Sequence, residues 1–405
     1  EENLGFFQMI TYKQAKKIIQ NFVVSSSGFE EISVLSSNQR ILKVSIKAKV
    51  SNPRFDQSAM DGAIIYASDN TKKTLKLVGE SKAGDLTSRD FKKGEAKLIF
   101  TGGPVAGKKK KIIPKEDFII DEEGKKIVII KPNKYDFIRK EGSDYKKGHE
   151  CISKDSIMHC RSIALAKSMK VNKIKVKSKP KISVIITGDE LISKNNKFGI
   201  IESSNEILIK SIISKFGGNI LEIHNVRDNI KDFQKIYDSL SNFDLLITSG
   251  GISRGKYDIV KNVLGGNGLE ILFDRVKIKP GKPSTFGKFK NNKFFLGLPG
   301  NPVSCFISMI IFFSVYINSF FGIDYINLYT RQMQCNAKVK KNNSLTTFLR
   351  IKTNKDRKSF SVFDYQDSSL QKILNDSDGL IIRKPFEKEI KVGDFVDVLL
   401  YRDIL

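Results

Sequence analysis

The sequence predicts a multidomain protein of the α/β plus β class, and three observations lead to this prediction. The chain has 405 residues, well beyond one ordinary domain of ~150 residues. Apolar strands alternate with amphipathic helices from residue 181 to about residue 264, as in a sheet covered by helices. Short apolar runs separated by turns fill residues 28–138 and 332–401, and each of these regions is typical of a β-rich domain.

The N-terminal half begins with a predicted helix over residues 11–22, in which Thr11 is a possible N-cap. Short strands are then expected at residues 41–46, 63–66, 75–78, 97–100 and 126–131. The lysine run 108–111 is expected to form a solvated loop. Further on, residues 148–170 predict mostly helix, and the basic stretch 173–181 predicts a connector.

The α/β region places polar and glycine-rich turns directly after its strands. Strands are expected at residues 182–186, 219–226 and 244–248, and helices at residues 204–216, 232–240 and 259–264. In such sheets the ligand site lies beyond the carboxyl ends of the strands. Here those ends carry the segments TGDEL (187–191), RDN (227–229), SGG (249–251) and LPGNP (298–302). A binding site is therefore expected at this edge.

The segment Val303 to Phe321 is mostly apolar and carries no charge, so its length is compatible with a membrane span. It contains serine and asparagine side chains, however, and it starts directly after a Pro-Gly-Asn-Pro turn. A buried helix in a soluble domain is favoured over a membrane helix.

The formal net charge of +26 is the most unusual number in the composition. A nucleic acid or a membrane surface would be the obvious partner for such a chain. The charge comes from 57 lysines and only 13 arginines, whereas proteins that read phosphates and bases rely on the arginine fork. We therefore expect no nucleic-acid partner and no membrane partner.

The cysteine content and the first residues of the sequence bear on the cellular location and on a possible zinc site. Four cysteines are too few for a disulfide framework, and the start of the sequence lacks the pattern of a secretion signal. A cytoplasmic location is therefore expected. The pairs His149/Cys151 and His159/Cys160 do not match zinc-ligand spacing, so a zinc site is disfavoured there.

A glycine-rich turn at residues 249–258 joins a predicted strand to a predicted helix. Backbone amides in such a turn can approach a phosphate at a helix N-terminus. Asp258 could hold Mg²⁺ against the same phosphate. Acidic residues also follow the other strands, namely Asp189, Glu190 and Asp228. Carboxylates beside an anion-binding loop suggest a Mg²⁺-dependent phosphate site, although each alone could be a helix cap.

Two proline-rich turns carry further candidate ligands. Lys279 and Lys282, in the segment KPGKP, place two ammonium groups three residues apart on a backbone stiffened by prolines. Such a turn can clamp an oxyanion at little entropic cost. The turn LPGNP, with Pro299 and Asn301, could present backbone amides to a ligand, or could simply start the helix that follows.

With these motifs assembled, the chain resembles the MoeA and gephyrin E-domain family, the molybdopterin molybdenumtransferases. The match is collinear from about Thr11 to Tyr401. It runs through the segments PxxDxSAMDG (53–62), FTGxP (100–104), RxxGxD (139–144), TGDEL, SGGxSxGxxD (249–258), KPGKP and LPGNPVS.

The resemblance implies an elongated subunit with several parts. These are an N-terminal helix (1–25), a small linker domain (26–47 and 141–178), a β-rich inserted domain bearing SAMDG (48–140), a molybdopterin-binding α/β domain (179–325) and a C-terminal β-barrel-like domain (326–405). It also implies a homodimer in which the active cleft lies between the α/β domain of one subunit and the inserted domain of the other.

The activity implied is the insertion of molybdate into adenylylated molybdopterin, with release of AMP and a requirement for Mg²⁺. Tungstate has the same charge and nearly the same size as molybdate, so both oxyanions suit this chemistry. The implied protein partners are the molybdopterin adenylyltransferase and the molybdoenzymes that receive the cofactor. A scaffold or carrier that binds molybdopterin without turnover remains the alternative.

The resemblance also implies roles for individual residues. The phosphate or adenylate would lie on Gly250, Gly251 and Ser253, the Mg²⁺ on Asp258 and Asp189, and the pterin beside Glu190 and Asp228. Molybdate would be bound by Lys279, Lys282, Arg350 and Ser369, next to Pro299 and Asn301, and the partner subunit would supply the equivalents of Asp61 and Thr101. Lys256 stands where the family usually has an acid, and its charge could lower the metal affinity of Asp258.

Overall fold

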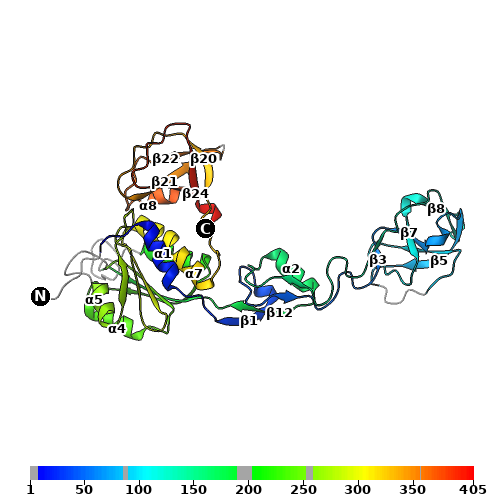
Figure 1. The fold of residues 1–405 in the computed structure, drawn as a ribbon, viewed down its shortest axis with the longest axis horizontal. Coiled ribbons are helices and arrows are strands. Elements are labelled where there is room, and N and C mark those ends of the chain that lie inside the picture. The colour runs from blue at the N-terminus through cyan, green and yellow to red at the C-terminus, as the bar shows by residue number, and fades with distance from the viewer. Residues whose placement is uncertain (1–7, 85–89, 189–202, 252–258, 356) are drawn as a thin grey trace, which may run out of the picture. The chain divides into compact units, whose positions relative to one another are not determined.

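A computed structural model describes residues 8–84, 90–188, 203–251, 259–355 and 357–405. The chain forms two compact units, and each is described by itself (Figure 1). Unit 1 comprises residues 1–28 and 177–405, and unit 2 comprises residues 29–176. The predicted multidomain α/β plus β class is confirmed, while the finer domain boundaries stay predictions.

The centre of unit 1 is a mixed six-stranded sheet in the order β14-β13-β15-β19-β18-β16. Four strands are parallel, namely β13 (Lys181–Thr187), β14 (Asn219–Val226), β15 (Leu245–Ser249) and β19 (Phe294–Leu298). The antiparallel strands β16 (Glu270–Asp274) and β18 (Thr285–Lys288) complete it. Strands β15 and β19 are buried along their whole length, which explains why they are continuous apolar runs in the sequence.

Helices cover this sheet. Helices α4 (Ile230–Ser239) and α5 (Ile259–Gly266) pack against each other and share a core cluster with side chains of β13, β15 and β19. Helix α3 (Ser204–Lys215) packs on α6 (Pro302–Ser308), and α1 (Tyr12–Phe22) packs on α7 (Ser314–Phe321). The predicted cap of α1 is confirmed, since Thr11 accepts from the Gln14 amide in a capping box.

The apolar segment after LPGNP is one continuous helical run of α6 (Pro302–Ser308), a π-helical turn (Met309–Phe313) and α7 (Ser314–Phe321). Among the described residues it is the one helix long and apolar enough to cross a membrane. Within the fold, 89% of its most apolar window is buried, and α7 ends at Gly322 with a φ of 66°. The predicted buried helix is confirmed as the core helix of unit 1.

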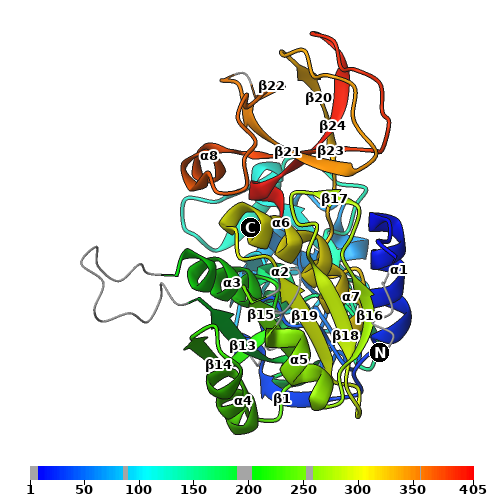
Figure 2. The ribbon, with the colours of Figure 1, turned by 90° about the vertical axis from the view of Figure 1, so that its left-hand side faces the viewer.

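The C-terminal part of unit 1 is a barrel of five strands. They are β20 (Arg331–Cys335), β21 (Thr346–Thr353), β22 (Ser359–Val362), β23 (Gly379–Arg383) and β24 (Phe395–Leu400), closed by the pairing of β21 with β23. Strand β17 (Ile278–Lys279) comes from the α/β part of the sequence but pairs with β21, with Lys279 opposite Thr347. Figure 2 shows the barrel beside α6 and β17, so the KPGKP turn lies where the two folds meet.

Unit 2 contains a curled six-stranded sheet in the order β7-β4-β6-β5-β9-β8. Its strands are β4 (Gly62–Tyr66), β5 (Thr74–Ser81), β6 (Glu95–Ile99), β7 (Lys110–Pro114), β8 (Phe118–Ile120) and β9 (Lys126–Ile129). The rest of unit 2 has three short strand pairs and helix α2 (Cys160–Ser168). The pairs join β1 (Phe29–Ser33) to β12 (Lys173–Lys177), β2 (Ile46–Lys47) to β11 (Glu150–Ile152), and β3 (Gln57–Ser58) to β10 (Ile138–Arg139).

Four sequence-based predictions for unit 2 are wrong. The strand expected at residues 41–46 shrinks to β2, and the helix expected at 148–170 is limited to α2. The stretch 173–177 is the strand β12 rather than a connector. Its lysines alternate with the buried residues Ile174 and Val176, which is the two-residue period of a strand. The high lysine content of the whole chain made this alternation look like an ordinary basic stretch.

The lysine run is the clearest error, because Lys110 and Lys111 are buried in β7 rather than solvated. The Lys110 Nζ lies 3.4 Å from the centroid of the Tyr66 ring and 3.6 Å from that of Phe91. It also pairs with Asp90 at 3.0 Å. A cation held between two aromatic faces and beside a carboxylate can be buried without losing its charge.

Lys110→Ala is expected to destabilise unit 2 by ~2 kcal/mol, since it leaves a gap between two rings and removes the cation–π contact. Lys108→Ala, an exposed residue of the same run, is the control and should change stability by less than ~0.5 kcal/mol. Urea unfolding of the full chain measures both. Equal stabilities of the two variants would show that the buried ammonium contributes nothing.

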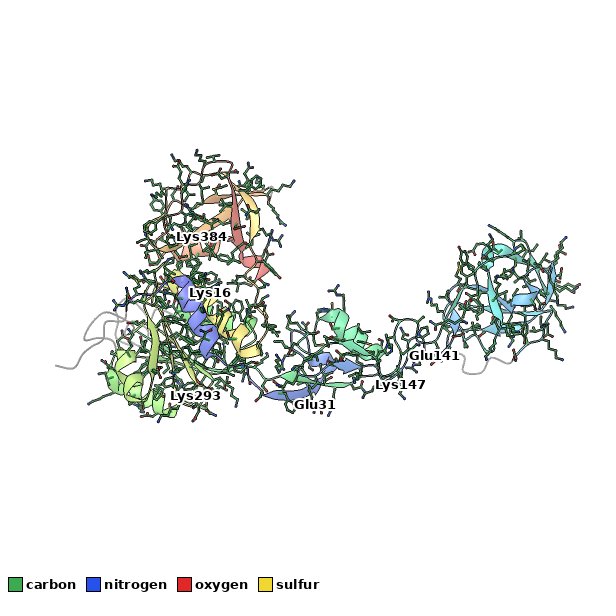
Figure 3. All side chains as sticks on the ribbon, in the orientation of Figure 1. Lys16, Glu31, Glu141, Lys147, Lys293 and Lys384 are labelled. Atoms are coloured by element: carbon green, nitrogen blue, oxygen red, sulfur yellow. The ribbon has the colours of Figure 1, made fainter. Side chains whose placement is uncertain are left out.

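The basic charge is spread over the chain. Figure 3 labels Lys16 on α1, Lys293 before β19, Lys384 after β23 and Lys147 in unit 2, each in a different part of the chain. The high net charge therefore reflects a general use of lysine.

Candidate functional site

The glycine turn after β15 forms a close backbone contact with the end of β13. Gly250 and Gly251 have φ angles of 85° and 63°. A Cβ on Gly250 would lie 2.5 Å from the carbonyl oxygen of Thr187, and one on Gly251 would lie 2.7 Å from the Thr187 hydroxyl. Both positions therefore require glycine, and the turn exposes backbone at the carboxyl edge of the sheet, as the sequence predicted.

Asn205, at the start of α3, ties this edge together. Its Nδ2 donates to Ser249 Oγ at 2.9 Å and to the carbonyl oxygen of Gly300 at 2.6 Å. Ser249 Oγ in turn donates to the carbonyl oxygen of Pro299 at 3.3 Å. The SGG turn and the LPGNP turn are thus held side by side. Asn205 is not predicted by the sequence, because it belongs to no motif and only its place in the first turn of a predicted helix distinguishes it.

Two buried oxygen atoms at this edge have no hydrogen-bond partner among the described residues, namely Thr187 Oγ1 and Asn205 Oδ1. Buried polar atoms are normally paired, so unpaired oxygens at a strand end are places where a cation or a donor group of a ligand fits. Asp228 follows the neighbouring strand β14 and is exposed. The other predicted residues of this edge, Asp189, Glu190, Ser253 and Asp258, lie outside the described residues.

A cavity of about 720 Å³ lies next to this edge, where the α/β sheet meets the barrel. Its lining comes from the segments 278–283, 299–304 and 366–368, together with Leu345. Lys279 and Lys282 are exposed, and the charge of Lys279 acts on the Asp367 carboxylate in the same lining. The predicted pair of cations is therefore brought together with Pro299 and Asn301 in one pocket.

The turn that carries the two lysines rests on buried serines. Gly281 has a φ of 102°, and a Cβ there would lie 2.7 Å from Ser308 Oγ. Ser284 Oγ donates to the Gly281 carbonyl at 2.7 Å and lies 2.9 Å from Ser308 Oγ. The Val276 amide also donates to the Lys282 carbonyl at 2.9 Å. These contacts fix the backbone and leave both lysine side chains available to a ligand.

The third wall of the pocket is the loop 366–370, which contacts the LPGNP turn directly. Asn301 Nδ2 donates to Ser368 Oγ at 2.8 Å, and the Val303 amide donates to the Ser368 carbonyl at 3.2 Å. Ser369 is turned toward Asp367, because its hydroxyl donates to Asp367 Oδ1 at 2.6 Å. The pocket is therefore lined by Gln366, Asp367 and Ser368 at this point.

Arg350, expected beside the oxyanion, is buried behind this loop, with 1% of its surface exposed. Its guanidinium donates to the carbonyl of Asp367 at 2.9 Å, to the carbonyl of Leu370 at 3.3 Å and to Gln366 Oε1 at 3.3 Å. Arg350 does not line the cavity. Its contacts instead fix the loop that does.

In unit 2 the structure brings Asp61 and Thr101 together, as predicted. Asp61 Oδ1 accepts from the Thr101 amide at 2.7 Å and from its hydroxyl at 2.8 Å. These two hydrogen bonds, helped by the charge of Lys115, hold the pKa of Asp61 below its ordinary value. A Cβ on the next residue, Gly62, would lie 2.1 Å from the Ile113 carbonyl oxygen, so this turn requires glycine.

A helix-covered sheet with a glycine turn at its carboxyl edge defines an α/β ligand-binding domain, and comparison with known families shows which one it is. The profile named "Probable molybdopterin binding domain" matches residues 183–318, and "MoeA N-terminal region (domain I and II)" matches residues 10–169. Together these matches span more than half of the chain. The chain belongs to the MoeA family of molybdopterin molybdenumtransferases.

Individual relatives lead to the same family. The molybdopterin molybdenumtransferase of Haemophilus influenzae is 32% identical over 304 residues, which cover 74% of this chain and 75% of that protein. The Staphylococcus epidermidis protein of the same name is 26% identical over 403 residues, covering 96% and 95%. A crystal structure of a molybdopterin biosynthesis MoeA protein from Pyrococcus horikoshii matches with a TM-score of 0.81 and 26% identity, covering 97% of this chain and 99% of that one. The chain is thus a transferase of molybdenum cofactor biosynthesis.

Proposed function

We propose that the chain inserts molybdate into adenylylated molybdopterin, with release of AMP, in a reaction that requires Mg²⁺. The observation that carries this proposal is the direct connection between the glycine edge and the lysine pocket. The LPGNP turn contacts the edge through Ser249 and the pocket wall through Ser368. A phosphate at the glycine edge and an oxyanion in the lysine pocket would therefore lie next to each other. A transfer reaction needs its two reactants held close together in this way.

The adenylate phosphate is assigned to Gly250, Gly251 and Ser253, and the pterin to the side of Glu190 and Asp228. The positive φ angles of the two glycines support the first assignment, because such turns can present backbone amides to phosphate oxygens. The position of Asp228 after β14, beside the TGDEL strand, supports the second.

Mg²⁺ is assigned to Asp258 with Asp189, which follow β15 and β13 in the sequence. Mg²⁺ prefers oxygen ligands, and the unpaired Thr187 hydroxyl at the same edge fits such an ion. When bound, the ion would neutralise charge on the phosphate that is cleaved.

Molybdate is assigned to Lys279 and Lys282, beside Pro299 and Asn301. Two ammonium groups in one pocket match the double charge of the oxyanion. The sequence predicts that Ser369 and Arg350 also bind molybdate. Their hydrogen bonds to Asp367 indicate instead that they hold the loop 366–370, which forms one wall of the pocket.

The remaining assignments concern partners and compartment. We propose a homodimer in which Asp61 and Thr101 of a second copy complete the cleft, supported by their ionised, hydrogen-bonded arrangement. The molybdopterin adenylyltransferase and recipient molybdoenzymes would be its protein partners. The four free cysteines support a reducing cytoplasm.

The test is an anaerobic assay of the purified chain with adenylylated molybdopterin, molybdate and Mg²⁺. An enzyme releases AMP and yields cofactor that activates a cofactor-free molybdoenzyme. The alternative, a carrier, binds molybdopterin but releases no AMP, and that result would overturn the proposal.

A further inference from the structure

The oxyanion pocket contains a carboxylate as well as two lysines. Asp367 lines the same cavity as Lys279 and Lys282. Resting on the proposed function, we propose that Asp367 is a specificity-determining residue whose negative charge weakens the binding of fully ionised tetrahedral oxyanions such as molybdate.

The position of Asp367 is fixed from two sides. Its carbonyl accepts from the buried guanidinium of Arg350 at 2.9 Å. Its Oδ1 accepts from the Ser369 amide at 2.8 Å and from the Ser369 hydroxyl at 2.6 Å. The carboxylate is thus held on the pocket wall by its own loop, and it does not depend on a lysine partner to stay there.

The charge of this carboxylate persists at neutral pH. The hydroxyl and the amide of Ser369 hold the pKa of Asp367 below its ordinary value, and the charges of Arg350 and Lys279 lower it further. A dianion that enters the pocket therefore meets two cations and one fixed anion.

This arrangement affects different oxyanions differently. Molybdate at neutral pH carries no proton, so it can only be repelled by the carboxylate. Hydrogen phosphate carries an O–H group that can donate to a carboxylate, and this offsets the repulsion. The carboxylate also keeps molybdate loosely bound before transfer, and tight binding of the unreacted substrate adds nothing to the rate of the chemical step.

Asp367→Asn removes the charge and keeps an oxygen that can accept from Ser369. We expect the Kd for molybdate to fall about tenfold at low ionic strength, because a Coulomb repulsion acting over a few ångströms is removed, and the Kd for phosphate to fall less. Isothermal titration of the full chain with sodium molybdate and with inorganic phosphate measures both. Asp364→Asn, an exposed neighbour outside the pocket lining, is the matched control and should leave both values unchanged.

Ser369→Ala is a second variant, because it frees the carboxylate but keeps its charge. Molybdate should bind it no more than about twofold more tightly, since the charge that dominates the effect remains. The role of Asp367 is overturned if the Asp367→Asn protein binds molybdate as weakly as the wild type, or if its affinity for phosphate rises as much as its affinity for molybdate. Failure of the wild type and every variant to bind molybdate would instead overturn the proposed oxyanion pocket.

Discussion

Replacing Lys282 by alanine is expected to lower kcat/KM for molybdate about 10²-fold, because one preorganised cation is lost from the oxyanion pocket. The side chain is exposed, and the turn is held by backbone contacts and by buried serines. The fold should therefore be unaffected, and the KM for adenylylated molybdopterin should stay the same. Raising the molybdate concentration should restore much of the rate.

The matched control is Lys290→Ala, an exposed lysine of unit 1 that does not line the oxyanion pocket. Steady-state AMP release against molybdate concentration compares the two variants, with thermal unfolding as a check on the fold. Equal activity of both would mean that the pocket is not where molybdate binds.

Asp258→Ala is expected to lower Mg²⁺-dependent AMP release by at least about 10²-fold while molybdopterin still binds. The reason is chemical. A carboxylate that holds Mg²⁺ against the cleaved phosphate contributes to the transition state and much less to recognition of the pterin. Turnover measured across a Mg²⁺ titration, with ligand binding followed by fluorescence, separates the two effects.

Asp238→Ala, on the exposed face of α4, is the control and should retain full activity. Full Mg²⁺-dependent turnover by Asp258→Ala would exclude Asp258 as the metal ligand. Lys256→Ala should raise the apparent affinity for Mg²⁺, since it removes a positive charge beside the ligand.

The α/β domain was predictable from the sequence because its central strands β13, β15 and β19 are buried on both faces. Strand β14 has the predicted bounds of 219–226, and β15 differs by one residue at each end. Turn motifs likewise predicted Gly250, Gly251, Lys279 and Lys282, since special backbone geometry leaves glycine and proline in the sequence.

Unit 2 was harder to predict, because its strands are short and its burial depends on unusual partners. Nothing local indicates that Lys110 lies between Tyr66 and Phe91, which are distant in sequence. The same limit applies to the site. Asn205 and Asp367 join it through tertiary contacts with Gly300 and Arg350, and a motif search does not detect such contacts.

We propose that one site couples cleavage of the adenylate to insertion of the oxyanion. This coupling can be measured in a single-turnover experiment, with the chain in excess over adenylylated molybdopterin and with Mg²⁺ and molybdate present. AMP and molybdenum bound to molybdopterin are measured in the same sample. We expect one AMP for each molybdenum inserted and little AMP without an oxyanion. AMP release that is indifferent to molybdate, or insertion of molybdenum without AMP, would contradict it.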